Sequence, residues 1–188
     1  IGGDITAGNI SFDTAVTLAN TGATIVFSTA AADGNIALGS TLGNTTDESI
    51  TFSAGAGSIN VDGAVTLANL AGAGGDILVT TANDVDFNST VNANNFTQNS
   101  AEATGTTTFT GLATLAGNFD FTGQALTING VGNNTVGGNM DVTNAGVFTT
   151  AAGANLVVTG NVTQDGVGAN TIGGDITAGN ISFDTAVT

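Results

Sequence analysis

Carboxylates are the only ionisable side chains that this sequence offers for chemistry. The 188 residues contain 15 Asp and Glu but no Lys, Arg, His, Cys or Tyr. Two carboxylates about 5 to 9.5 Å apart can hydrolyse a glycosidic bond. The candidate pairs are Asp84 with Asp86, Asp47 with Glu48, and Asp120 with Asp141. Acid–base catalysis also needs neighbours that tune charge and stabilise anions, and the chain lacks the basic side chains that do so. We therefore predict that the protein is not an enzyme and has no catalytic residues.

A second chemistry open to carboxylates is the binding of hard cations such as Ca²⁺, which prefer oxygen ligands. The segment Asn83–Asp86 alternates oxygen-bearing side chains along one face of an expected strand, so Asp84 and Asp86 are candidate calcium ligands. The Asp47–Glu48 segment is a second candidate place. Neither segment matches an EF-hand loop or the glycine-rich calcium nonapeptide. The alternative is unspecific association of cations with an acidic chain.

The charge balance excludes several classes of partner. The formal net charge is −15 and the pI is about 4.1, with no basic residue anywhere. Without Lys or Arg the chain cannot neutralise phosphates, so we expect no nucleic-acid partner and no attraction to anionic membranes. No apolar run is long enough to insert into a bilayer. Cysteine is absent, so disulfides cannot stabilise the fold.

The elements that must hold these carboxylates are short β-strands. Alternation of apolar and polar residues recurs with a period of two, as in 9–13, 48–52 and 118–121. Each run is bounded by Gly, Asn or Asp, which favour turns. The ten Phe residues lie at positions that this alternation would bury, Phe96 and Phe148 less clearly than the others. Disorder, the alternative for an acidic chain with few aromatics, does not fit a hydrophobic fraction of 41%.

The turns predict how the strands are arranged. A Gly followed by Asn, Asp or Ser opens many strands, as at Gly8, Gly34, Gly57, Gly117 and Gly138. These residues tolerate the backbone conformations of sharp corners. A sandwich built from hairpins needs two-residue turns, and Asn129-Gly130 is the one dipeptide of the strongest hairpin type. We therefore predict an all-β, right-handed parallel β-solenoid, or β-helix, of continuously stacked coils.

One long stretch of the sequence occurs twice without change. Residues Ile1–Thr17 return as Ile172–Thr188, an offset of 171 residues. We interpret 1–171 as one tandem repeat period and 172–188 as the start of the next identical repeat. The second copy is expected to take the structural place of the first, one period along the axis. Eight or nine coils per period would advance it about 40 Å.

Five segments carry a family resemblance: GNISFDTAVTL (8–18), DGNIALGSTLG (33–43), ESITFSAGAGSINVDGAVTL (48–67), DVDFNSTVNANNFTQ (84–98) and GTTTFTGLATLAGNFDFTGQALTING (105–130). In these the chain resembles the large bacterial β-strand-repeat surface proteins, akin to filamentous-haemagglutinin-like and autotransporter-type β-helix adhesins. The resemblance implies a secreted, cell-surface fibre that acts in adhesion or as a scaffold or sheath. Its expected partner is itself, end to end as tandem repeats or stacked subunits and laterally in bundles.

Two other functions remain open. The side face of the solenoid could bind surface glycans or other cells, and a binding face of this kind needs an exposed aromatic or acidic cluster. Ice binding needs Thr-x-Thr on the same face of successive coils. The Thr-rich run 106–110 suggests this, but the Thr positions are expected to scatter among Ser, Asn and Asp.

Overall fold

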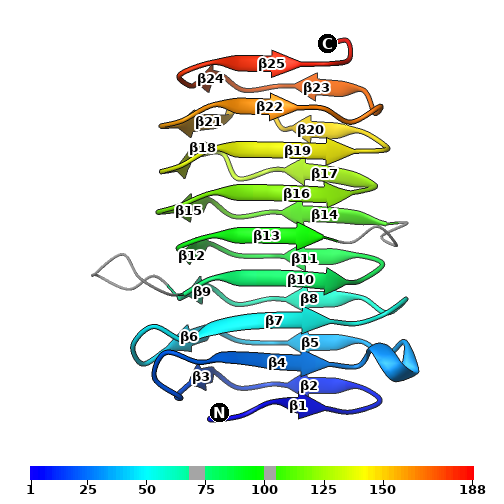
Figure 1. Ribbon diagram of the computed structural model, residues 1–188, viewed down its shortest axis with the longest axis vertical. Coiled ribbons are helices and arrows are strands. Elements are labelled where there is room, and N and C mark those ends of the chain that lie inside the picture. Colours follow the sequence, from blue (N-terminus) through cyan, green and yellow to red (C-terminus); the bar gives the residue numbers. More distant parts are fainter. Residues whose placement is uncertain (68–74, 100–104) are drawn as a thin grey trace.

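The computed structural model describes residues 1–67, 75–99 and 105–188 and forms a right-handed parallel β-solenoid, which confirms the predicted fold class (Figure 1). The chain runs from left to right along the front sheet and returns behind it, rising by one coil in each circuit. Each strand pairs in parallel with the strand three places later in the chain. Three sheets therefore grow together over about eight coils of the described chain.

Sheet A, in front in Figure 1, contains β1 (Ile5–Thr6), β4 (Thr24–Ser28), β7 (Ser49–Ser53), β10 (Ile77–Thr81), β13 (Phe96–Asn99), β16 (Phe119–Gly123), β19 (Met140–Asn144), β22 (Val162–Gln164) and β25 (Ile181–Phe183). Sheet B contains β2 (Ile10–Phe12), β5 (Ile36–Leu38), β8 (Ile59–Val61), β11 (Val85–Phe87), β14 (Thr106–Phe109), β17 (Ala125–Ile128), β20 (Phe148–Thr150) and β23 (Asn170–Ile172). Sheet C contains β3 (Val16–Leu18), β6 (Leu42–Asn44), β9 (Val65–Thr66), β12 (Val91–Ala93), β15 (Ala113–Leu115), β18 (Gly132–Val136), β21 (Ala154–Val158) and β24 (Ile176–Thr177). A short 3₁₀ turn, Ala30–Ala32, lies between β4 and β5.

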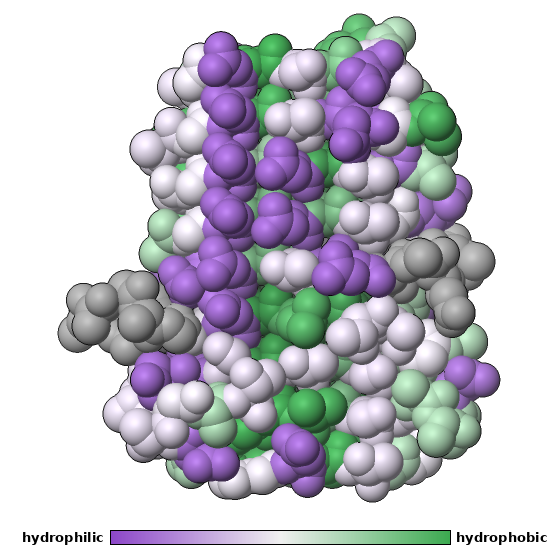
Figure 2. All heavy atoms as spheres, in the orientation of Figure 1, coloured by the Kyte–Doolittle hydropathy of each residue, from purple (hydrophilic) through white to green (hydrophobic). Residues whose placement is uncertain are grey.

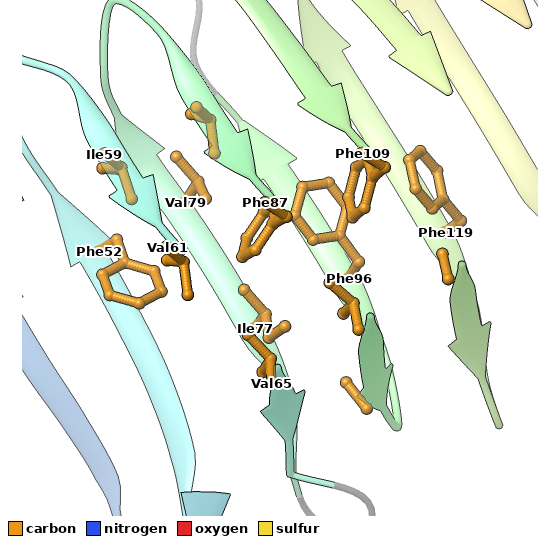
Figure 3. Packing of buried hydrophobic residues seen from close by; sticks show 14 of the residues in the cluster. Phe52, Ile59, Val61, Val65, Ile77, Val79, Phe87, Phe96, Phe109 and Phe119 are labelled. Atoms are coloured by element: carbon orange, nitrogen blue, oxygen red, sulfur yellow. The ribbon is translucent and has the colours of Figure 1, made fainter. Parts of the chain in front are cut away.

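Apolar side chains that point inward stack along the axis and form the core. Phe96 of β13 lies beside Phe119 of β16, with ring centroids 5.0 Å apart. Phe87 and Phe109 of sheet B stack at 5.0 Å, and Phe96 meets Phe109 edge-on at 5.1 Å (Figure 3). Contacts of this geometry add to the free energy gained by burying the rings. The period-two pattern therefore produces columns of like residues, one from each coil.

Burial of the phenylalanines agrees closely with the sequence prediction. Eight of the ten are buried, and these include Phe96 and Phe148. The other two, Phe12 and Phe183, are only partly buried and pack against the core from the outermost coils. They are equivalent residues of the two identical segments, so the difference from the other eight comes from position at the ends of the stack.

Close stacking of successive corners explains some of the glycines that open strands. A Cβ atom at Gly34 would overlap the carbonyl oxygen of Gly8 in the coil before it. A Cβ atom at Gly57 would in turn overlap the carbonyl oxygen of Gly34. At this corner the backbone of one coil lies directly on the backbone of the next, and no side chain fits between them.

We expected the second copy of the 17-residue segment to take the structural place of the first. This expectation was wrong, because the two copies lie in different sheets. Ile5 lies in sheet A, whereas its equivalent Ile176 lies in sheet C. Ile10 lies in sheet B, whereas Ile181 lies in sheet A. The physical reason is the number of strands: β1 and β24 are 23 strands apart, and 23 is not a multiple of three. One period is thus about 7⅔ coils, shorter than the expected eight or nine.

Candidate functional site

The predicted calcium ligands lie on the outer side of sheet B, at and just before β11. Asp84 accepts a hydrogen bond from the backbone N–H of Thr106 at 2.9 Å and another from Asn83 Nδ2 at 3.1 Å. Burial raises the pKa of the Asp86 carboxyl; the charge of Asp84 raises it further, and a hydrogen bond with Thr108 opposes both. Asp84 therefore helps to join neighbouring coils, and the calcium site at Asp84 and Asp86 stays a prediction. Within the three described ranges, no group of three or more acidic side chains could hold a metal ion.

The second predicted pair, Asp47 and Glu48, is engaged by donors of the protein itself. The Glu48 side chain is fully buried in the turn between β6 and β7. Its carboxylate accepts hydrogen bonds from five groups: Asn20 N, Thr45 N, Thr46 N, Thr45 Oγ1 and Thr46 Oγ1. Asp47 accepts the backbone N–H of Gly22 at 2.6 Å. A cation or substrate at this place would have to displace these donors. The donor set that makes Glu48 structural comes from turn residues, and their convergence could not be seen in the sequence.

The third pair does come together. Asp120 of β16 and Asp141 of β19 are directly paired across sheet A, on neighbouring coils. Burial raises the pKa of Asp120, and the nearby charge of Asp141 raises it further. The sequence contains no basic side chain to neutralise the pair. The geometry therefore places two carboxylates next to each other on the outer face of sheet A.

Asp120 also borders a hollow on the outer face of sheet A. The hollow has a volume of about 470 Å³ and is lined mainly by polar side chains: Thr24, Ser49, Thr51, Asp76, Asn95, Thr97, Asn99, Asn118 and Asp120, with the apolar Ile50, Ile77 and Leu78. These groups can exchange hydrogen bonds with hydroxyl-rich ligands. No Phe contributes to the lining, because the ring side chains named in the core point inward.

A ladder of polar side chains runs along the strand starts of sheet A. Its members are Asp76, Asn95, Asn118, Asn139, Asn161 and Asn180, here called the Asn ladder. Each of the first four accepts the backbone N–H of the next member at 2.7 to 3.1 Å, and Asn161 accepts the side-chain amide of Asn180 at 3.0 Å. Figure 2 shows a vertical column of hydrophilic residues on this face. The sequence marked Asn118 and Asn139 as corner residues that follow Gly117 and Gly138, but the role of the ladder residues as acceptors between coils required the register.

The threonines of sheet B are better aligned than the sequence suggested. Thr108, Thr127, Thr149 and Thr171 are paired in one column over four successive coils. The expectation that Thr positions scatter was therefore wrong for this column. The residues two places before them are Thr106, Ala125, Val147 and Ala169. The residues two places after them are Thr110, Asn129, Ala151 and Gly173, so the second Thr column that a regular Thr-x-Thr surface needs is absent from these four coils.

The outermost coils of the described stack carry strands that are paired on one side only. The outermost strands are β1, β2 and β3 at one end and β25, β23 and β24 at the other. An edge strand presents unpaired N–H and C=O groups, and proteins usually block such edges with Lys, Pro or bulges. This chain has neither Lys nor Pro. Ile181 and Val187 are each 48% exposed at one end, and Ile5 and Phe12 are only partly covered at the other.

Comparisons with known proteins found no relative of the chain. No protein-family model, curated protein or solved structure matches the chain. In the part of the chain that the structure describes, no helix has the length and apolar character needed to cross a bilayer. The candidate sites therefore rest on the sequence and the geometry alone.

Proposed function

We propose that this chain is a structural repeat of an extracellular bacterial β-helical filament, serving as an adhesin, scaffold or sheath fibre without catalysis. The observation that carries the proposal is the continuous stack of three parallel sheets in which the same 17-residue sequence occurs twice, in the first coil and in the last. The segment forms the first coil at one end and seats strands on the stack at the other. The acidic composition without basic residues and the resemblance to bacterial surface fibres support a location on the cell surface.

The test is self-association of the chain along its axis. We expect the purified protein at high concentration to form thin filaments in negative-stain electron microscopy. Ile181→Lys should shorten or abolish them, because a charged side chain on the exposed edge strand opposes pairing with another copy. Thr114→Lys is the matched control, since Thr114 is exposed on β15 in the middle of the stack. Discrete particles at all concentrations, or equal loss of filaments in both variants, would contradict axial assembly.

The hollow on sheet A supports a second candidate, in which the side face binds surface glycans. Its lining of Asp, Asn and Thr side chains suits hydrogen bonding to sugar hydroxyls. A glycan array probed with the labelled protein would test this function. Binding that is lost in Thr97→Val, which removes a hydroxyl from the lining with little change of shape, would support it. If the protein binds none of the glycans, the glycan-binding function is contradicted and only the scaffold function remains.

A further inference from the structure

We propose that, in a tandem array of this sequence, each 171-residue period is rotated about the fibre axis by one sheet relative to the period before it. This inference rests on the proposed function, because it describes how a second copy of the sequence continues the filament. Every outer feature of one period would then appear on a different side in the next period. After three periods it would return to its first side.

The placement of the duplicated segment carries the proposal. In the first copy, Ile5 pairs with Phe27 in sheet A. In the second copy, the equivalent Ile176 pairs with Leu156 in sheet C. The strand that lies in sheet A in the first copy therefore lies in sheet C in the second.

The other two strands of the segment shift in the same direction. Ile10 belongs to sheet B, but its equivalent Ile181 pairs with Val162 in sheet A. Val16 belongs to sheet C, but its equivalent Val187 forms a bridge with Asn170 in sheet B. All three strands move by one sheet, so the shift is a rotation of the whole coil path by about a third of a turn.

The Asn ladder shows that the rotated junction is compatible with the side chains. In the first copy, Asn9 accepts the backbone N–H of Asn35 at 2.9 Å, and Asn35 accepts that of Ser58, along sheet B. In the second copy, the equivalent Asn180 joins the end of the ladder on sheet A by its bond to Asn161. The residue that starts one polar column therefore also extends another. With the next period in place, the equivalents of Asn35 and Ser58 would lengthen the column on sheet A.

The rotation has a consequence for what the fibre displays. The hollow and the Asp120–Asp141 pair lie on sheet A of one period, so they would lie on sheet C of the next and on sheet B of the one after. Any partner of these features would find them on all three sides of the fibre. With coils about 4.8 Å apart, one period of 7⅔ coils rises about 37 Å.

Disulfide trapping in the 188-residue chain tests the rotation. Thr163 and Ser182 are paired on the outer face of sheet A, whereas Thr171 lies in sheet B. The pair Thr171 and Ser182 is the negative control, because β23 and β25 lie in different sheets. Neighbouring parallel strands bring Cα atoms within the range of a disulfide. The chain has no native Cys, so the introduced pair is the only source of thiols.

We expect Thr163→Cys/Ser182→Cys to close a disulfide under mild oxidation in dilute solution and Thr171→Cys/Ser182→Cys to stay reduced. The opposite result, or a failure of both pairs to close, would overturn the rotation. Because trapping occurs within one dilute chain, it does not depend on filament formation. If the expected disulfide forms but no filaments are seen, only the proposed function is contradicted.

A helical reconstruction of filaments is a second test of the rotation. It should show a rise near 37 Å per period with a rotation of a third of a turn. A rise without rotation would also overturn the proposed rotation.

Discussion

The carboxylate of Glu48 accepts the backbone N–H of Thr46 at 2.9 Å, inside the turn that joins β6 to β7. Thr45 and Asn20 donate to the same carboxylate from the same turn and from the preceding coil. A buried charge is tolerated when hydrogen bonds satisfy it, and here the donors are backbone and hydroxyl groups instead of a basic side chain. Glu48 thus stabilises a corner of a solenoid whose sequence contains no basic side chain.

Replacing Glu48 by Gln should destabilise the protein. The side chain keeps its shape, but one acceptor oxygen becomes an NH₂ group that faces N–H donors. Loss of charged hydrogen bonds in a buried site costs about 2 kcal/mol, which urea unfolding would detect. Asp13→Asn removes the same charge at an exposed position and should change the stability little. Equal urea midpoints for Glu48→Gln and the unchanged protein would show that the bonds contribute nothing.

The pH dependence of stability should have a component from Glu48. Burial tends to raise its pKa, but hydrogen bonds led by that of Thr46 outweigh burial and hold the pKa at about 2, below the ordinary 4.5. The folded state therefore binds the proton more weakly than the unfolded state, and this contribution to stability is lost as the pH falls from 4.5 towards 2. The difference in urea midpoint between Glu48→Gln and the unchanged protein should be largest near neutral pH and should shrink over this range. A difference that is independent of pH would refute the assignment to Glu48.

Asp120 should act with the opposite sign. Burial, followed by the charge of Asp141, raises its pKa, so its contribution to stability is present at low pH and is lost as the pH rises through the raised value. Asp120→Asn should therefore stabilise the protein at neutral pH by about 0.5 kcal/mol, the scale of a like-charge pair on adjacent strands. The gain should shrink at high salt, because screening weakens the repulsion that it relieves. A destabilised variant at neutral pH would show that the carboxylate makes a favourable contact.

The Asn ladder should contribute to stability through its backbone acceptors. Asn118→Ala removes the oxygen that accepts the N–H of Asn139, and the loss of one such bond costs about 1 kcal/mol. Asn92→Ala is the matched control, because Asn92 is exposed on β12 outside the ladder. Thermal unfolding of both variants measures the difference. If the two substitutions lower the melting temperature equally, the ladder bond adds nothing beyond strand propensity.

The calcium prediction has its own test. A specific site at Asp84 and Asp86 predicts that millimolar Ca²⁺ raises the melting temperature more than Na⁺ does at the same ionic strength. Asp86→Asn should remove this excess and Asp120→Asn should not, because only Asp86 belongs to the predicted site. Asp84 is left unchanged because it accepts the backbone N–H of Thr106. Identical melting temperatures in chelator and in Ca²⁺ would contradict a specific site.

Much of the fold follows from local patterns in the sequence. Alternation at period two selects strands and the inward Phe positions, because side chains on a strand point alternately to opposite faces. Gly residues at corners such as Gly34 mark the places where one backbone lies on another. These features depend on neighbouring residues along the chain, and they were sufficient to predict a parallel solenoid.

What the sequence could not decide is which residues meet across coils. The donors around Glu48, the Thr column ending at Thr171 and the Asp120–Asp141 pair all depend on register, which is set by pairing between residues about twenty or more apart. The duplicated segment is the clearest case. The local pattern around Ile176 is identical to that around Ile5, so the sequence was enough to predict a strand at both places. That Ile176 lies in sheet C follows from the folded stack, because the sheet depends on how many strands precede it, and the 23 described strands before it do not fill whole coils of three.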